Sequence, residues 1–126
     1  MHHSRISTLM IDCLEDSFEQ ALAFWPQALG LPPPRRPAAD QRYVTLGEIP
    51  GPLFVRLQKV QQDPGYHLDI ETEDMRQETA RLEAAGARRK YKIRRWWVME
   101  DPSGNAFCVI RPESEGFPKL ARRWAK

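Results

Sequence analysis

The chain has 126 residues, 41% of them hydrophobic, and a formal net charge of only +2, which is the composition of one ordinary globular domain. These values exclude a disordered chain, and the net charge is too small to indicate nucleic-acid binding by itself. No apolar run approaches the roughly 20 residues needed to span a bilayer. The two cysteines, Cys13 and Cys108, have no CxxC spacing, so we expect reduced thiols in the cytoplasm rather than a disulfide framework or a structural zinc site.

The N-terminal residues Met1 to Ser4 have no apolar signal-peptide core. Because the end of a chain is usually mobile, we expect neither His2 nor His3 to bind a ligand. The first ordered element is expected to be the short, partly β-branched strand at residues 6–13.

A helix and two more strands complete the first half of the chain. Four apolar residues at a spacing of three to four define one face of the helix: Phe18, Leu22, Trp25 and Leu29. Gly30 is a typical residue just beyond a helix C-terminus, and the prolines of residues 31–39 favour a loop or an edge segment. Strands are predicted at residues 41–46 and 53–60, with a turn at residues 47–52 between them.

The second half repeats this order after a turn-rich linker at residues 61–65. Residues 66–72 predict a strand, and the helical run that follows ends at Gly86. The basic run at residues 87–94 predicts an edge strand whose charges are exposed to solvent.

Two further strands, at residues 96–100 and 106–111, flank a turn at residues 101–105, where Asp, Pro, Gly and Asn are the residues that tight turns favour. The expected register places six residues on one face of the sheet: Glu100 opposite Ala106, Val98 opposite Cys108, and Trp96 opposite Ile110. Trp97, on the other face, and Trp25 of the first helix are expected in the core.

The two halves align as copies of one β-α-β-β-β unit, in which Thr8 occupies the place of His67. We therefore predict an α+β fold of two tandem modules, residues 5–60 and 65–112, that form an open curved sheet with a central cleft. The helices would cover the outer faces of the sheet. Residues 113–126 are expected to form a C-terminal extension.

Three motifs of the first half, Ile11-Asp12-Cys13, Phe24-Trp25 and Leu29-Gly30, are followed by three of the second half, His67–Glu71, Arg81–Ala87 and Asp101–Cys108. Together they resemble the vicinal oxygen chelate superfamily, also called the glyoxalase/bleomycin resistance protein/dioxygenase fold. The resemblance covers about residues 5–112. Within the superfamily, the chain most resembles the glyoxalase-like subgroup of small single-domain proteins, whose functions are mostly unassigned. It implies one glyoxalase-like domain over these residues, with a ligand cleft between the modules.

In metal-dependent members of the superfamily each module contributes two ligands, and the metal polarises oxygen atoms of the substrate. The resemblance places these positions at Thr8, at Gln58 (or Arg56 in the other register), at His67 and at Cys108. Hard divalent ions prefer several oxygen ligands, and Arg56 would repel a cation. We therefore expect no cofactor. A divalent metal is the less favoured alternative, with His67, Cys108 and Gln58 as its ligands.

The resemblance and the strand alternation together give a set of pocket candidates: Thr8, Arg56, Gln58, His67, Asp69, Trp96, Val98, Glu100 and Cys108. His67 is expected to line the pocket or to form a hydrogen bond in the core. Cys108 is expected to be a small buried hydrophobe unless it pairs with His67 as a thiolate. Trp96 could stack on a planar ligand. The two acidic residues of the set are expected to pair with Arg56 and Arg94 rather than to hold a cationic ligand.

These observations predict a protein that binds a small organic molecule, with catalytic residues unknown. One alternative is a metal-dependent lyase, isomerase or dioxygenase of the same superfamily, and another is a non-enzymatic drug-sequestering protein. A regulatory or nucleic-acid-associated protein would use the basic residues 88–95, but nucleic acid is not an expected partner. We expect a homodimer without a membrane partner, because open sheet edges need protection. The tail would pack across the dimer interface through Phe117, Leu120 and Trp124, or form a surface extension.

Overall fold

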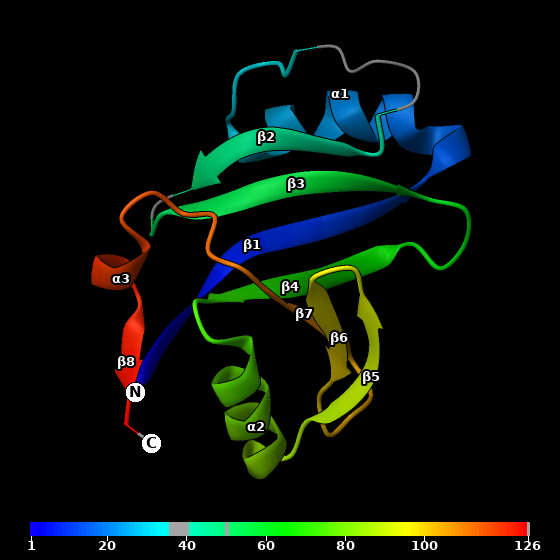
Figure 1. Cartoon of the computed structure of the whole chain (residues 1–126). Helices are drawn as coiled ribbons and strands as arrows, with labels where there is room; N and C mark the ends of the chain where they lie inside the picture. The colour runs from blue at the N-terminus through cyan, green and yellow to red at the C-terminus, as the bar shows by residue number, and fades with distance from the viewer. Residues whose placement is uncertain (36–40, 50, 126) are drawn as a thin grey trace. The chain divides into compact units, whose positions relative to one another are not determined.

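The computed structural model describes residues 1–35, 41–49 and 51–125, and the chain folds into two compact units (Figure 1). Unit 1 consists of Met1–Ser7 and His67–Lys126, and unit 2 consists of Thr8–Tyr66. Each unit contains strands and one helix of 11 or 12 residues, so the fold class is α+β, as predicted. No helix in the described part of the chain is long and apolar enough to cross a membrane.

Unit 2 is a three-stranded sheet with one helix. Strand β1 (His2–Leu14) continues from unit 1 into unit 2, where it pairs in parallel with β3 (Leu53–Val60). Strand β2 (Tyr43–Ile49) pairs with β3 in the antiparallel sense. A 3-10 turn, η1 (Glu15–Ser17), leads from β1 into helix α1 (Phe18–Leu29). Parallel pairing of β1 with β3 requires this crossover connection through the helix.

The core of unit 2 is apolar and joins residues of α1 to residues of its three strands. Its buried members are Ile11, Cys13, Phe18, Leu22, Val44, Leu46, Val55 and Leu57. The predicted helix face is confirmed at Phe18 and Leu22, whereas Leu29 is 38% exposed at the helix end. Gly30 follows with a φ of +70°, the left-handed conformation expected after a helix C-terminus.

Unit 1 contains a mixed sheet in the order β4-β7-β6-β5, with β5 at its edge. The bounds of its elements are β4 (Gly65–Thr72), α2 (Met75–Ala85), β5 (Arg88–Ile93), β6 (Trp96–Glu100) and β7 (Ala106–Ile110). Strands β4 and β7 are parallel, whereas β7, β6 and β5 are successively antiparallel. Every residue of β5 is exposed, which confirms a basic edge strand.

The register of the β6–β7 hairpin is the predicted one, with Val98 opposite Cys108 and Glu100 opposite Ala106. Helix α2 packs against β7. Met99 and Val109, which point to the opposite face from Cys108, are completely buried. Unit 1 therefore has one face covered by its helix and one face without a helix.

The C-terminal extension packs on the beginning of the same chain. It forms a short helix, α3 (Phe117–Leu120), and strand β8 (Arg122–Trp124), which is antiparallel to the first residues of β1 (Figure 1). Phe117 is buried, and the indole of Trp124 donates a hydrogen bond to Ser4 Oγ at 2.8 Å. Leu120 is exposed.

Two expectations about strand boundaries are wrong. Strand β1 begins at His2, not at residue 6, because β8 supplies a pairing partner for its first residues. The expected mobility of the N-terminal end is wrong for the same reason, and His2 is only 3% exposed. Strand β2 ends at Ile49 and not at residue 46, so it includes Gly47 and the two residues after it, where a turn was predicted. The register of β2 against β3 shifts between Thr45 and Gly47.

Candidate functional site

Three chemically reactive side chains lie together on the helix-free face of unit 1. His67 and Asp69 occupy alternate positions of β4 and therefore share a face, and Cys108 lies opposite Asp69 on β7. One ligand atom from each, an imidazole nitrogen, a carboxylate oxygen and the sulfur, lie within 4.8 Å of one another. We call these three residues the His-Asp-Cys cluster.

The His-Asp-Cys cluster is largely withdrawn from solvent. The side chains of His67 and Asp69 are 16% and 9% exposed, and their nearest atoms, Nε2 and Oδ1, are 3.7 Å apart. Cys108 is half-buried. An imidazole beside a thiol and a carboxylate can accept a proton from the thiol, and the carboxylate then stabilises the imidazolium. The same three groups can also bind a metal ion.

The apolar candidates on this face lie on β6. Val98 is buried opposite Cys108, and Trp96 is half-buried two residues before it. Glu100 lies on the same face, where it forms ion pairs with Arg88 at 3.4 Å and Lys90 at 3.6 Å. The expected pairing of Glu100 with Arg94 is wrong, because the β5–β6 register places Arg88 directly opposite Glu100.

The remaining candidates lie in unit 2, on the face of its sheet that points away from the apolar core. Arg56 donates to the hydroxyls of Thr8 at 3.1 Å and Thr45 at 2.9 Å. The amide of Gln58 donates to the hydroxyl of Tyr43 at 3.2 Å. The structure thus groups Thr8, Arg56 and Gln58 within unit 2 and the other six candidates within unit 1.

The profile of the glyoxalase-like domain family matches residues 8–110. The chain belongs to this family. The superfamily resemblance seen in the sequence motifs is thereby confirmed.

Solved structures with this glyoxalase-like fold include methylmalonyl-CoA epimerases. A variant of the Streptomyces coelicolor enzyme, in complex with 2-nitronate-propionyl-CoA, has a TM-score of 0.58 and 14% identity over 86% of this chain and 98% of the epimerase. A methylmalonyl-CoA epimerase in complex with methylmalonyl-CoA and NH4+ has the same TM-score and identity, over 86% of this chain and 95% of that chain. At this identity the likeness shows the fold alone. No curated protein sequence matches the chain.

In this glyoxalase-like chain, sequence reasoning identified Asp69 as a pocket residue but not as a possible metal ligand. The spacing of two residues between His67 and Asp69 on a strand puts both side chains on one face, and the same spacing makes Asp69 a possible ligand beside His67. The expected third ligand, Gln58, belongs to unit 2.

Sequence reasoning also missed a buried ionic network at α2. Glu78 is completely buried, and its carboxylate accepts hydrogen bonds from Arg81 Nε and Nη2, both at 2.8 Å, and from His2 Nε2 at 2.7 Å. Burial opposes ionisation of Glu78, but the hydrogen bonds from Arg81 and His2 outweigh it and lower the pKa of the carboxyl. A second buried carboxylate, Glu71, accepts from Arg5 Nη1 at 3.0 Å.

Proposed function

We propose that this glyoxalase-like protein binds a small organic molecule on the helix-free face of unit 1. The observation that carries the proposal is the His-Asp-Cys cluster, which places three polar, reactive groups within 4.8 Å of one another. Trp96 and Val98 supply apolar surface on the same face. A mainly apolar surface with a few convergent polar groups is the usual composition of a small-molecule site.

The fold is compatible with such a ligand, because the epimerase structures of similar fold hold acyl-CoA esters. In the proposed site His67 donates or accepts a hydrogen bond, with Asp69 beside it to stabilise the protonated ring. The half-buried ring of Trp96 offers a face for stacking on a planar group. A ligand with both an oxygen function and a planar or apolar part would use all of these residues.

A thermal-shift screen of small organic compounds tests the proposal with three proteins: wild type, His67→Ala and His3→Ala. His3 is a matched control because it is in the same unit and pairs with Glu73, outside the cluster. We expect compounds that raise the melting temperature of wild type and of His3→Ala but not of His67→Ala. Stabilisation of His67→Ala equal to that of wild type by every such compound would contradict the proposed site.

The same compounds separate turnover from sequestration. A bound compound that is recovered unchanged after incubation identifies a binding protein of the drug-sequestering kind. A compound that is converted, with conversion lost in His67→Ala, identifies an enzyme whose reaction depends on the proposed site. Both outcomes agree with the proposed binding site. The assay decides whether the protein also catalyses a reaction there.

A second candidate function, metal-assisted chemistry, is favoured by the donor atoms of the cluster. Imidazole, carboxylate and thiolate suit a borderline ion such as Zn²⁺ better than Mg²⁺, which prefers an all-oxygen shell. His67, Asp69 and Cys108 would hold the ion, and the protein would leave at least one position open for a ligand. A bound ion of this kind acts as a Lewis acid on a substrate oxygen.

Titration with Co²⁺ tests this second candidate without any assay of activity. Thiolate ligation gives a charge-transfer absorption in the near ultraviolet, so wild type would show this band and Cys108→Ser would not. Asp69→Asn would keep the band and bind the ion more weakly, because the thiolate remains. Absence of the band in wild type at saturating Co²⁺ would exclude Cys108 as a ligand and leave the metal-free proposal in place.

We also propose that the protein is a cytoplasmic homodimer. Two reduced cysteines and the exposed edge strand β5 support this proposal. Sedimentation equilibrium of the full chain tests it, with a mass near twice 14.6 kDa as the expected result. A monomer at all accessible concentrations would contradict the dimer.

A further inference from the structure

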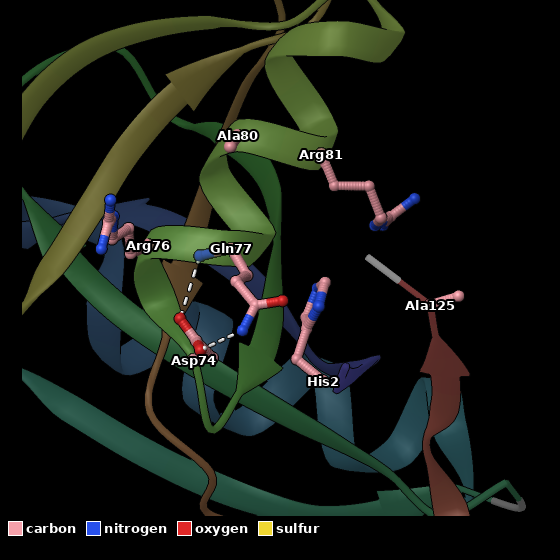
Figure 2. A pocket seen from close by; sticks show the side chains of 7 residues that line it. All are labelled: His2, Asp74, Arg76, Gln77, Ala80, Arg81 and Ala125. Carbon is pink, nitrogen blue, oxygen red and sulfur yellow. Dashed lines mark hydrogen bonds between the residues drawn. The ribbon is translucent and has the colours of Figure 1, made fainter.

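A concave surface of unit 1 lies on α2, away from the helix-free face. It is a pocket of about 600 Å³ whose wall combines Asp74, four residues of α2, His2 and Ala125 (Figure 2). No member of the His-Asp-Cys cluster lines it. The volume lies within the range of about 300 to 1,000 Å³ that small-molecule sites occupy.

His2 brings a buried nitrogen without a partner to this wall. Its Nε2 lies 2.7 Å from Glu78 Oε1, and an ionised carboxylate only accepts hydrogen bonds, so Nε2 carries the hydrogen. The other ring nitrogen, Nδ1, is buried and has no hydrogen-bond partner within the described ranges. Leaving a buried polar atom unpaired is unfavourable, so a group that supplied the missing partner would stabilise this arrangement.

Arg81 is fixed in the wall by two neighbours. Two of its nitrogens donate to Glu78, and its guanidinium carbon lies 3.8 Å from the ring centroid of Trp124. The charges of Arg81 and Glu78 therefore compensate each other, but the planar guanidinium keeps further N–H donors. Figure 2 shows Arg81 and Ala125 on the same side of the pocket as His2.

The acidic group of the wall is already engaged, whereas a basic group is not. Asp74 accepts from the backbone N–H of Gln77 at 2.9 Å and from its amide at 2.6 Å, as the dashed lines in Figure 2 mark. The exposed guanidinium of Arg76 forms no hydrogen bond or ion pair with any residue that the structure describes. The groups left for a ligand are therefore a free cation, the remaining donors of Arg81 and the His2 ring.

We propose that this pocket is a second ligand site, for a small organic anion with a carboxylate or phosphate group. Arg76 lies at the opposite end of the wall from His2 and Arg81 (Figure 2), where it supplies an uncompensated charge and a fork of donors that matches either oxyanion. The positive end of α2 lies at the same wall and favours negative charge. The hydroxyl of hydrogen phosphate can donate to the unpartnered Nδ1 of His2. This site is separate from the His-Asp-Cys cluster, so an experiment can contradict one proposed site without contradicting the other.

Backbone amide NMR titrations test the proposal with inorganic phosphate and with acetate, each against sodium chloride at equal ionic strength. The proteins are wild type, Arg76→Gln and the matched control Arg95→Gln, which removes the same charge from an exposed turn of unit 1. We expect saturable shifts concentrated at residues 74–81 and at His2. The dissociation constant should rise about tenfold in Arg76→Gln, as for loss of one charge-assisted hydrogen bond, and stay unchanged in Arg95→Gln.

The two probes also identify the anionic group, because phosphate alone or acetate alone would give saturable shifts if the pocket selected one of them. Saturation by neither anion would overturn the proposal. Equal weakening in Arg76→Gln and Arg95→Gln would also overturn it, since that result indicates attraction to the net charge of unit 1. His67→Ala, outside this pocket, should titrate like wild type.

Discussion

The two units bury their helices against very different surroundings. In unit 2, α1 places Phe18 and Leu22 in an apolar cluster with strand residues such as Leu57. In unit 1, the completely buried residues of α2 are Glu78 and Thr79, and Glu78 is held by Arg81 and His2. Unit 2 thus relies on apolar area removed from water, whereas unit 1 relies on charge pairing as well.

The side chains on the helix-free faces of the two units also differ. In unit 2, Arg56 donates to the hydroxyls of Thr8 and Thr45, and Gln58 donates to the hydroxyl of Tyr43. In unit 1 the corresponding face carries an imidazole, a carboxylate and a thiol close together. Among the described residues, the reactive side chains that lie close together are therefore concentrated in unit 1.

Leu57→Ala should give the largest loss of stability, because Leu57 is fully buried in the apolar core of unit 2. We expect the free energy of unfolding to fall by about 4 kcal/mol, from lost transfer energy and the cavity left behind. Urea unfolding followed by tryptophan fluorescence measures it. The loss should be the same at neutral and at mildly acidic pH. A loss that changed with pH would contradict the purely apolar account of unit 2.

Glu78→Ala should cost about 3 kcal/mol, since it leaves Arg81 and the buried His2 without their shared carboxylate. The control is Glu83→Ala, which removes a partly exposed ion pair with Arg89 and should cost less than about 1 kcal/mol. The same urea titrations compare the two variants. If both variants cost equally little, the ionic network of α2 contributes nothing specific to unit 1.

The contribution of Glu78 to the free energy of unfolding should decrease as the pH falls. Its pKa in the folded protein is lowered from an ordinary value of 4.5, so its contribution is present above that value and is lost as the pH falls through the folded pKa. The difference in unfolding free energy between wild type and Glu78→Gln should therefore shrink on acidification from about pH 6 to about pH 3. A difference that grew on acidification would show that the carboxyl is protonated in the folded protein.

Gly104→Ala should have the smallest effect, about 1 kcal/mol, and only through the backbone. Gly104 has a φ of +91°, and no atom lies within 4 Å of the added Cβ, so the cost is conformational strain. Gly65→Ala is the control, because its surroundings are equally open and its φ is not positive. Melting temperatures of the two variants compare them directly. An equal response would mean that the turn after β6 tolerates a side chain.

The sequence predicted most of the fold, because periodicity and turn chemistry are local. Strands β3 and β6 begin and end where predicted, and the hairpin register at Val98 and Cys108 is confirmed. The pairing of β1 with β8 was not predicted, because it joins residues more than 100 positions apart and neither segment has a strong pattern. The buried Glu78 was not predicted for the same reason, since its partner His2 is distant in sequence.

The candidate site could be predicted only in part. Alternation along β4 placed His67 and Asp69 on one face, and the turn motif placed Cys108 on β7. The parallel pairing of β4 with β7, which brings Cys108 opposite Asp69, has no local sequence signal. The same limit applies to the pocket on α2, which forms only when His2 and Ala125 are brought to the helix.

The central claim is that unit 1 carries the ligand chemistry on its helix-free face. The most direct test is to map backbone amide shifts on titration with the compound that binds best in the thermal-shift screen. We expect saturable shifts at His67–Asp69, at Trp96–Val98 and at Cys108, with all of them lost in His67→Ala. Shifts confined to the strands of unit 2, or unchanged in His67→Ala, would contradict the claim.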